Sequence, residues 1–184
     1  MTRVSVLLAV LLMLPAGLYA ADEYDGGAAR YLSTRAFLQQ AFDGDSYEGN
    51  LLIPDAGLRQ AMDTVLGHAY RARRIHYWRH GTRTAWVLDE IGRQDPITIG
   101  VVVGPSGIQA VDILVYREER GGEVHRPAFR QQFTGATLNN DNRLSVTVDG
   151  ITGATLSVHA VERTASLALL LHRRVMQQAP GATP

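Results

Sequence analysis

Apolar residues first recur at helical spacing and then alternate with polar residues along the chain. Residues 34–42 and 55–66 each carry an apolar face at a three-and-four spacing, which predicts two short helices. Four later runs alternate and are rich in β-branched and aromatic residues: 75–79, 83–91, 97–103 and 108–117. Turns rich in glycine and proline separate these runs. The pattern therefore predicts an antiparallel meander that follows two helices.

The last third of the chain returns to the helical pattern. Residues 126–133 predict a short helix, residues 143–148 a last strand, and residues 156–175 a long helix with one apolar stripe. Helices on either side of an antiparallel sheet predict a single α+β domain. We assign residues 90–177 to its core and residues 21–89 to an N-terminal part of the same domain.

Both ends of the chain differ from this domain. Residues 1–20 combine Arg3, an apolar run and a small-residue cleavage site at Ala20, which is typical of a secretory signal peptide. We therefore expect an exported, periplasmic protein. The apolar run is shorter than the roughly 20 residues of a spanning helix, so no membrane anchor is expected there. Residues 178–184 are expected to form a disordered tail.

Composition and charge narrow the classes of function. The 18 basic and 18 acidic residues cancel, whereas nucleic-acid-binding domains usually carry a basic excess, so we expect no nucleic-acid partner. The chain has no cysteine, which excludes disulfides, haem attached through Cys-x-x-Cys-His, iron–sulfur clusters and blue copper. An electron-transfer role would therefore need an organic cofactor.

Patterns of catalytic or metal-binding residues are not found. His76 and His80 stand four residues apart, but on a predicted strand they are separated by about 13 Å, too far for one ion. No nucleophile is paired with a base, and no two carboxylates form a catalytic pair. We therefore predict neither catalytic residues nor a metal site.

The strongest chemical signal is residues 149–157, Asp-Gly-Ile-Thr-Gly-Ala-Thr-Leu-Ser. Thr155 falls at the predicted N-terminus of the long helix, where unpaired N–H groups and a positive macrodipole favour a phosphate. Gly153 and Ala154 let a bulky ligand approach the backbone. The alternative is an Asp-Gly turn with Thr152 or Thr155 as an ordinary helix cap.

The tetrad Thr-Gly-Ala-Thr occurs twice, at residues 134–137 (the first copy) and at residues 152–155 (the second copy). Six positions before the last threonine, the first copy has Gln131 where the second has Asp149, and no long apolar helix follows the first copy. We therefore favour the second copy and keep Thr137 as the alternative attachment residue.

The pattern Asp-x-x-Thr-Gly-Ala-Thr-x-Ser resembles the attachment motif of the FMN-binding domain family, in which FMN is esterified through its phosphate to the last threonine. The resemblance covers roughly residues 90–175 and implies covalent FMN on Thr155. It implies further cofactor contacts from the motif and from the charged loop before the residue 126–133 helix: Asp149, Thr152, Gly153, Ala154, Ser157, Glu123 and Val124. Arg117 and Arg120 in this loop are candidates for stabilising reduced flavin.

The resemblance also implies partners. The family occurs in ion-translocating NADH:quinone reductases and ferredoxin:NAD reductases, as an extracytoplasmic domain that a flavin transferase loads using FAD and a divalent metal. Those subunits have a membrane anchor, which we do not expect here. The resemblance therefore favours a free carrier, or a subunit that docks on a membrane redox protein, with a membrane or periplasmic electron donor and acceptor.

We therefore hypothesise an exported electron-transfer flavoprotein, more an electron carrier or redox subunit than a stand-alone enzyme. Two alternatives stay open. One is a flavin-free periplasmic binding or assembly module on the same scaffold. The other is a small oxidoreductase that uses the same FMN.

Overall fold

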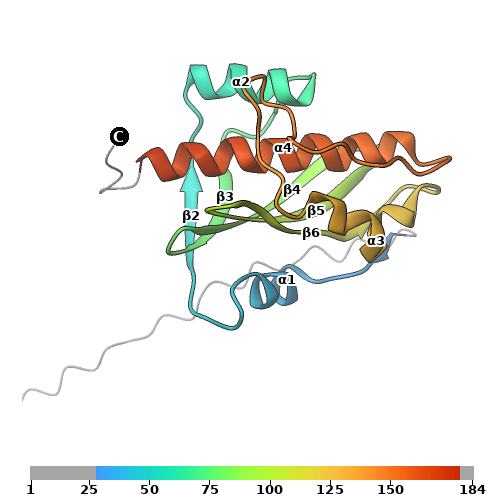
Figure 1. The fold of residues 1–184 in the computed structure, drawn as a ribbon, viewed down its shortest axis with the longest axis horizontal. Helices are drawn as coiled ribbons and strands as arrows, with labels where there is room; N and C mark the ends of the chain where they lie inside the picture. Colours follow the sequence, from blue (N-terminus) through green and yellow to red (C-terminus); the bar gives the residue numbers. More distant parts are fainter. Residues whose placement is uncertain (1–27, 179–184) are drawn as a thin grey trace, which may run out of the picture.

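The computed structural model describes residues 28–178, which form one antiparallel sheet covered by helices on both faces (Figure 1). The sheet has six strands in the order β1-β6-β5-β4-β3-β2. Their bounds are β1 Ala29–Arg30, β2 Glu48–Leu52, β3 Ile75–His80, β4 Arg83–Ile91, β5 Pro96–Gly104 and β6 Gly107–Tyr116. The predicted meander is confirmed in β3 to β6, and the first two strands close its edges.

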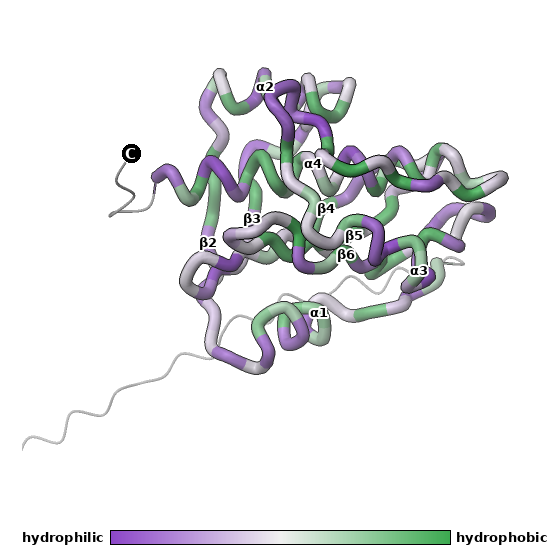
Figure 2. The backbone as a smooth tube through the Cα atoms, viewed as in Figure 1, coloured by the Kyte–Doolittle hydropathy of each residue, from purple (hydrophilic) through white to green (hydrophobic). Residues whose placement is uncertain are grey.

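The longest helix, α4 (Thr155–Gln178), lies along one face of the sheet, and α2 (Ala56–Leu66) packs against α4 (Figure 1). The opposite face is covered by α1 (Thr34–Ala41). Figure 2 shows hydrophobic residues in the central strands and at intervals along α4. The fold is therefore α+β, as predicted, with one large core beneath α4 and a smaller one beneath α1.

Local sequence signals explain where the first two helices begin and end. Ser33 caps α1 by accepting a hydrogen bond from the Ala36 N–H (3.1 Å), and Asp55 caps α2 through the Leu58 N–H (2.8 Å). Gly67 ends α2 at a φ of 75°, a left-handed conformation that glycine adopts without strain. Both predicted helices are thus confirmed.

Between β6 and α4 the chain forms short helical turns and an irregular segment. The predicted residue 126–133 helix is divided into α3 (Pro127–Arg130) and η2 (Gln131–Phe133), and a further helical turn, η1 (Gly122–His125), precedes it. The predicted residue 143–148 strand is wrong, since only an isolated bridge joins Leu138 to Leu144.

The apolar alternation that suggested this strand has another origin. Leu144, Val146 and Val148 pack against the large core, so every second side chain is partly buried although no neighbouring strand pairs with the segment. β2 lies between α1 and α2, where the sequence pattern predicted no strand, and α4 extends to Gln178, beyond the predicted end at residue 175.

The two ends of the chain fall largely outside the described residues. The predicted signal peptide, residues 1–20, and nearly all of the predicted tail lie outside the described residues. Within residues 28–178, no helix is both long and apolar enough to span a bilayer.

Candidate functional site

The second copy of the tetrad forms a tight turn that leads directly into α4. The Ala154 N–H donates to the Ile151 carbonyl (2.9 Å), and Gly153 adopts a φ of 83°. Thr155 is the first residue of the helix, and the Val158 N–H donates to the Ala154 carbonyl (2.9 Å). The placement of Thr155 at a helix N-terminus, predicted from sequence, is therefore confirmed.

The exposed surface of this turn is made of backbone and small polar side chains. Thr152, Gly153 and Thr155 are exposed, whereas Ala154 and Ser157 are only 3% and 4% exposed. Within residues 28–178, no acceptor is found for the N–H groups of the first three helical residues, as expected for the first turn of a helix. The turn thus presents free donors and a hydroxyl to the same region of solvent.

The loop between β6 and η1 is fastened to this helix start. The Tyr116 hydroxyl donates to the Arg120 carbonyl, so the Ser157 hydroxyl is the donor in its 2.8 Å bond with Tyr116. Burial is the main cause that raises the pKa of Tyr116, which keeps this phenol neutral. Gly121, at a φ of 90°, lies so close that an added Cβ would approach Ser157 Oγ to 2.7 Å. The loop can lie here only because residue 121 has no side chain.

Two hollows flank the turn. The first is about 480 Å³ and is lined by Tyr31, Glu119, Arg120, Gly121, Gly122, Glu123, His125, Arg126, Thr152 and Gly153. The second is about 360 Å³ and is lined by Arg93, Gln94, Asp95, Glu118, Glu119, Arg120, Gly153, Ala154, Thr155, Leu156 and Ser157. They share Glu119, Arg120 and Gly153, so they are adjoining parts of one region centred on the turn.

Aromatic and charged groups shape these hollows. In the first hollow, Tyr31 stacks on His125 with ring centroids 4.2 Å apart and planes 9° from parallel. In the second, the Glu118 carboxylate accepts the backbone N–H groups of Arg93, Gln94 and Asp95. Burial acts to raise the pKa of Glu118, but these three hydrogen bonds hold it below its usual value. Glu118 therefore fixes the residue 93–95 turn as one wall of the site.

Most of the predicted site residues come together here. Glu123, Thr152 and Gly153 line the first hollow, and Ala154, Thr155 and Ser157 line the second. Two do not line either hollow: Val124 and Asp149.

The position of each explains why. Val124 is 0% exposed and belongs to the large core, so it does not reach either hollow. Asp149 is exposed and donates its backbone N–H to Gln132 Oε1 (2.7 Å). Arg117 is also turned away, because its guanidinium donates to the Pro96 carbonyl (2.9 Å) and to Thr98 Oγ1 (3.0 Å).

Sequence reasoning missed Tyr31, His125 and Tyr116. Tyr31 directly follows β1, and pairing of β1 with β6 brings it to the site. Nothing in the local sequence around Tyr31 signals that contact. Tyr116 is the last residue of β6, and its role depends on the course of the following loop.

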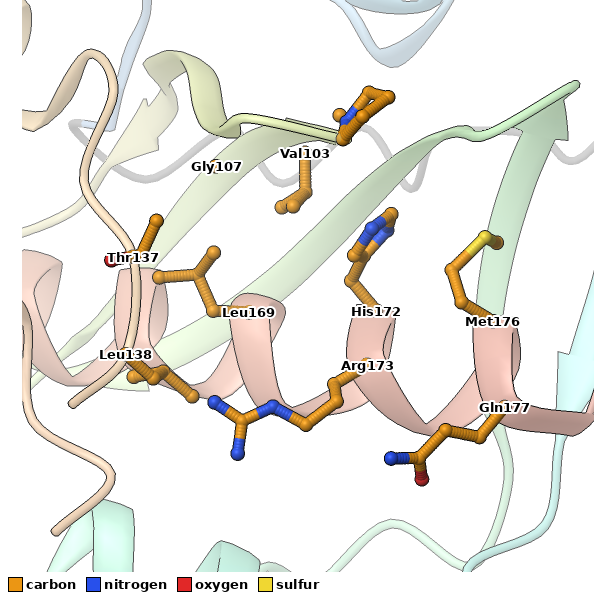
Figure 3. A pocket seen from close by; sticks show the side chains of 11 residues that line it. Val103, Gly107, Thr137, Leu138, Leu169, His172, Arg173, Met176 and Gln177 are labelled. Carbon is orange, nitrogen blue, oxygen red and sulfur yellow. The ribbon is translucent and has the colours of Figure 1, made fainter. Parts of the chain in front are cut away.

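The first copy of the tetrad lies elsewhere. It is tied to the start of β6, because the Ile108 N–H donates to the Ala136 carbonyl (2.9 Å) and the Gly135 N–H to the Ile108 carbonyl (2.7 Å). The Thr137 N–H donates to Ser145 Oγ (3.0 Å). Thr137 lines a third hollow beside the C-terminal half of α4 (Figure 3). This threonine therefore does not begin a helix.

A metal site is not found in the described part of the chain, where no cluster of three or more acidic, histidine or cysteine side chains occurs. His76 and His80 lie on β3, as predicted, and His80 Nδ1 hydrogen-bonds to the Ser46 carbonyl (2.6 Å).

Comparison with known proteins favours a flavin-binding function over the flavin-free alternative. Residues 92–169 match the family model described as FMN-binding domain. The chain carries an FMN-binding domain. The matched segment contains both tetrads, so the match alone does not choose between them. FMN is the cofactor of this domain.

The fold agrees with this assignment. The crystal structure of NqrC from Shewanella oneidensis superposes with a TM-score of 0.57 at 14% identity, covering 78% of this chain and 95% of that chain. At this identity the likeness shows a shared fold. No curated protein matches the sequence.

The residues around the second copy fit FMN. Free N–H groups at the start of α4 suit its phosphate, and the adjoining hollows offer space beside a stacked aromatic pair. Arg120 lines both hollows and supplies positive charge. The first copy lacks the helix start that would favour a phosphate.

Proposed function

We propose that the protein is an exported electron-transfer flavoprotein that carries FMN through a phosphoester bond to Thr155. The observation that carries the proposal is the exposed Thr155 hydroxyl at the first residue of α4, beside unpaired backbone N–H groups. These groups favour a phosphate whose remaining charge lies at the helix N-terminus.

Attachment would need a flavin transferase and FAD. Thr155 Oγ forms the new bond to the phosphorus on the FMN side of FAD, and the pyrophosphate bond breaks. AMP leaves, and the hydroxyl proton passes to a base of the transferase. The exposed turn leaves Thr155 accessible to such an enzyme. Gly153 and Ala154 add little bulk beside the reacting hydroxyl.

The remaining residues would hold and tune the cofactor. FMN supplies reversible electron uptake, and the protein supplies its orientation and electrostatic surroundings. Tyr116, Ser157 and Gly121 fix the loop that brings Arg120 to the site. Its positive charge favours the reduced, more negative flavin. Arg117 is engaged with Pro96 and Thr98, so Arg120 is the better candidate of the two.

The experiment is the intact mass and in-gel fluorescence of the denatured protein, produced with and without a flavin transferase. Wild type and Thr155→Ser should gain one FMN less one water and fluoresce, because each offers a hydroxyl. Thr155→Ala should remain unmodified, while Thr137→Ala should be loaded like wild type. Loss of flavin only in Thr137→Ala would overturn the proposed attachment site. An unmodified wild type despite an active transferase would overturn covalent attachment.

Export and partners are part of the same proposal. We expect cleavage after Ala20, which N-terminal sequencing of periplasmic protein would test. Leu156 and Ile91 are 48% and 47% exposed, and Leu156 lies next to Thr155. Apolar side chains exposed at the site would suit brief docking of a membrane or periplasmic redox partner. Charge or polar substitution of Ile91, which lines neither hollow, should slow electron exchange with that partner and leave flavin loading intact.

A further inference from the structure

A hollow of about 430 Å³ lies beside the C-terminal half of α4 (Figure 3). His172, which lines it, is 17 residues beyond Thr155 on the same helix, or about 25 Å along the axis. The volume falls in the range of small-molecule sites, roughly 300–1,000 Å³. The two regions are therefore separate.

A buried chain of hydrogen bonds determines which ring nitrogen of His172 carries the proton. The Trp86 indole N–H donates to Thr84 Oγ1 (2.9 Å), and Thr84 Oγ1 lies 2.8 Å from His172 Nδ1. Trp86 and Thr84 are both 0% exposed, so no water competes for these bonds. Since Thr84 Oγ1 accepts from Trp86, its own proton is free to be donated to Nδ1. The neutral ring then carries its proton on Nε2.

The electrostatic surroundings keep this histidine neutral. Burial, and secondarily the positive charge of Arg79, lowers the pKa of His172 to about 4. Its Nε2–H is thus a neutral donor at neutral pH. Among residues 28–178 no acceptor for that N–H is found, and the ring borders the hollow. A ligand or water in the hollow is its available acceptor.

The rest of the lining is mostly apolar, with Thr137, Gln177 and one cation, Arg173, as its polar side chains. Val103, Leu138, Leu169 and Met176 form its walls. Arg173 is exposed, and its side chain runs along α4 toward Leu138 (Figure 3). Within residues 28–178, no acidic side chain lines the hollow. The surroundings therefore combine apolar walls, a fixed neutral donor and a positive charge.

We propose that this hollow is a second ligand site, which takes a small aromatic carboxylate. The apolar walls accept the flat ring, the His172 Nε2–H donates to the carboxylate, and Arg173 provides the countercharge. The His172 ring projects from α4 toward Val103, whereas Arg173 runs along the helix toward Leu138, so Arg173 attracts the carboxylate through its charge rather than by sharing the contact with His172 (Figure 3). The site does not depend on flavin attachment.

The test is titration of the full chain with 4-fluorobenzoate, followed by ¹⁹F NMR. Wild type should bind saturably with a dissociation constant of about 1 mM or below, as a ligand of this size allows. The uncharged 4-fluorobenzamide should bind about tenfold more weakly. In Arg173→Gln, whose substituted side chain is exposed, the preference for the carboxylate should disappear.

Further variants separate this site from the flavin site and from folding effects. His172→Gln should weaken 4-fluorobenzoate about tenfold, and Leu169→Trp, which fills the hollow, should abolish binding even where Arg173 is retained. Thr155→Ala should bind as wild type does, whether or not flavin is loaded. Absence of saturable binding, binding that Arg173→Gln leaves unchanged, or binding lost in Thr155→Ala would each overturn the proposal.

Discussion

The two Thr-Gly-Ala-Thr copies adopt nearly the same turn and then diverge. Gly135 and Gly153 have φ values of 77° and 83°. The following alanines, Ala136 and Ala154, are 0% and 3% exposed, and both last threonines are exposed. The alanine N–H donates to the residue three positions earlier in each copy, at 3.0 Å and 2.9 Å. The tetrad therefore encodes a turn.

What differs is the chain that follows. After Thr155 comes a run of helix-compatible residues that forms α4, and the backbone N–H groups at the start of this helix are unpaired among residues 28–178. After Thr137 the side chain of Asn139 accepts the N–H groups of Asp141 and Arg143 (3.0 Å and 2.9 Å), which closes a separate loop. The proposed anion site thus depends on the helix rather than on the tetrad.

The largest expected effect comes from transplanting the flanking residues. In Thr155→Ala, the further changes Gln131→Asp and Asn139→Ser give the first copy the full attachment pattern. We expect no covalent flavin on Thr137, because no helix begins there. Intact mass after production with a flavin transferase measures this. If this triple variant is loaded, the local pattern suffices and the argument from the helix N-terminus is wrong.

A pair of glycine substitutions tests how each copy is held. An added Cβ at Gly107 (φ 109°) would collide with the Ala136 carbonyl, and at Gly121 (φ 90°) with Ser157 and Tyr116. Alanine at either position should lower the free energy of unfolding by roughly 3 kcal/mol, from backbone strain and overpacking.

Only one of the two should affect the cofactor. We expect Gly121→Ala to slow flavin loading of the folded protein, because it displaces the loop from the helix start. Gly107→Ala should load at the wild-type rate once folded. Urea unfolding and a time course of flavin fluorescence measure the two effects. Equal loading rates would show that the loop does not contribute to the site.

Much of the fold follows from sequence because local signals determine it. β4 spans the predicted residues 83–91, and the caps Ser33, Asp55 and Gly67 act as their residue types suggest. The residue 143–148 segment shows the limit: alternation reports which side chains are buried, not whether another strand is available to pair.

The residues of the candidate site likewise divide into those whose position local sequence determines and those whose position depends on tertiary contacts. Thr155 could be placed at a helix start because the long apolar stripe following it is a local property. Tyr31, which lines the first hollow, could not be placed from sequence. Its position depends on the pairing of β1 with β6, which are far apart in the chain. The direction of Arg117 also depends on tertiary contacts, with Pro96 and Thr98.

Acid should weaken the surroundings of the first copy. The folded-state pKa of His172 is about 4, below its ordinary 6.5, so between these values the unfolded chain binds a proton that the native state does not. Stability therefore falls as pH drops from about 6.5 to about 4. A shift of this size corresponds to at most about 3 kcal/mol.

Comparison with His172→Gln isolates this contribution. The variant loses the hydrogen bonds that the imidazole makes at neutral pH and has no titrating group at this position. The difference in unfolding free energy between wild type and variant should therefore shrink toward pH 4. Urea unfolding across this pH range measures it. A difference that stays constant with pH would show that His172 titrates normally in the folded protein.

The smallest effects distinguish the hydrogen bonds beside each copy. Tyr116→Phe removes the hydroxyl that joins Arg120 and Ser157, and Ser145→Ala removes the acceptor of the Thr137 N–H. Each should cost about 1 kcal/mol in unfolding free energy. Only Tyr116→Phe should alter the flavin midpoint potential, because it frees the loop that carries Arg120. A spectroelectrochemical titration of both loaded variants makes the comparison. If Ser145→Ala shifts the potential as much as Tyr116→Phe does, the environment of the flavin includes the first copy, and the division between the two turns does not hold.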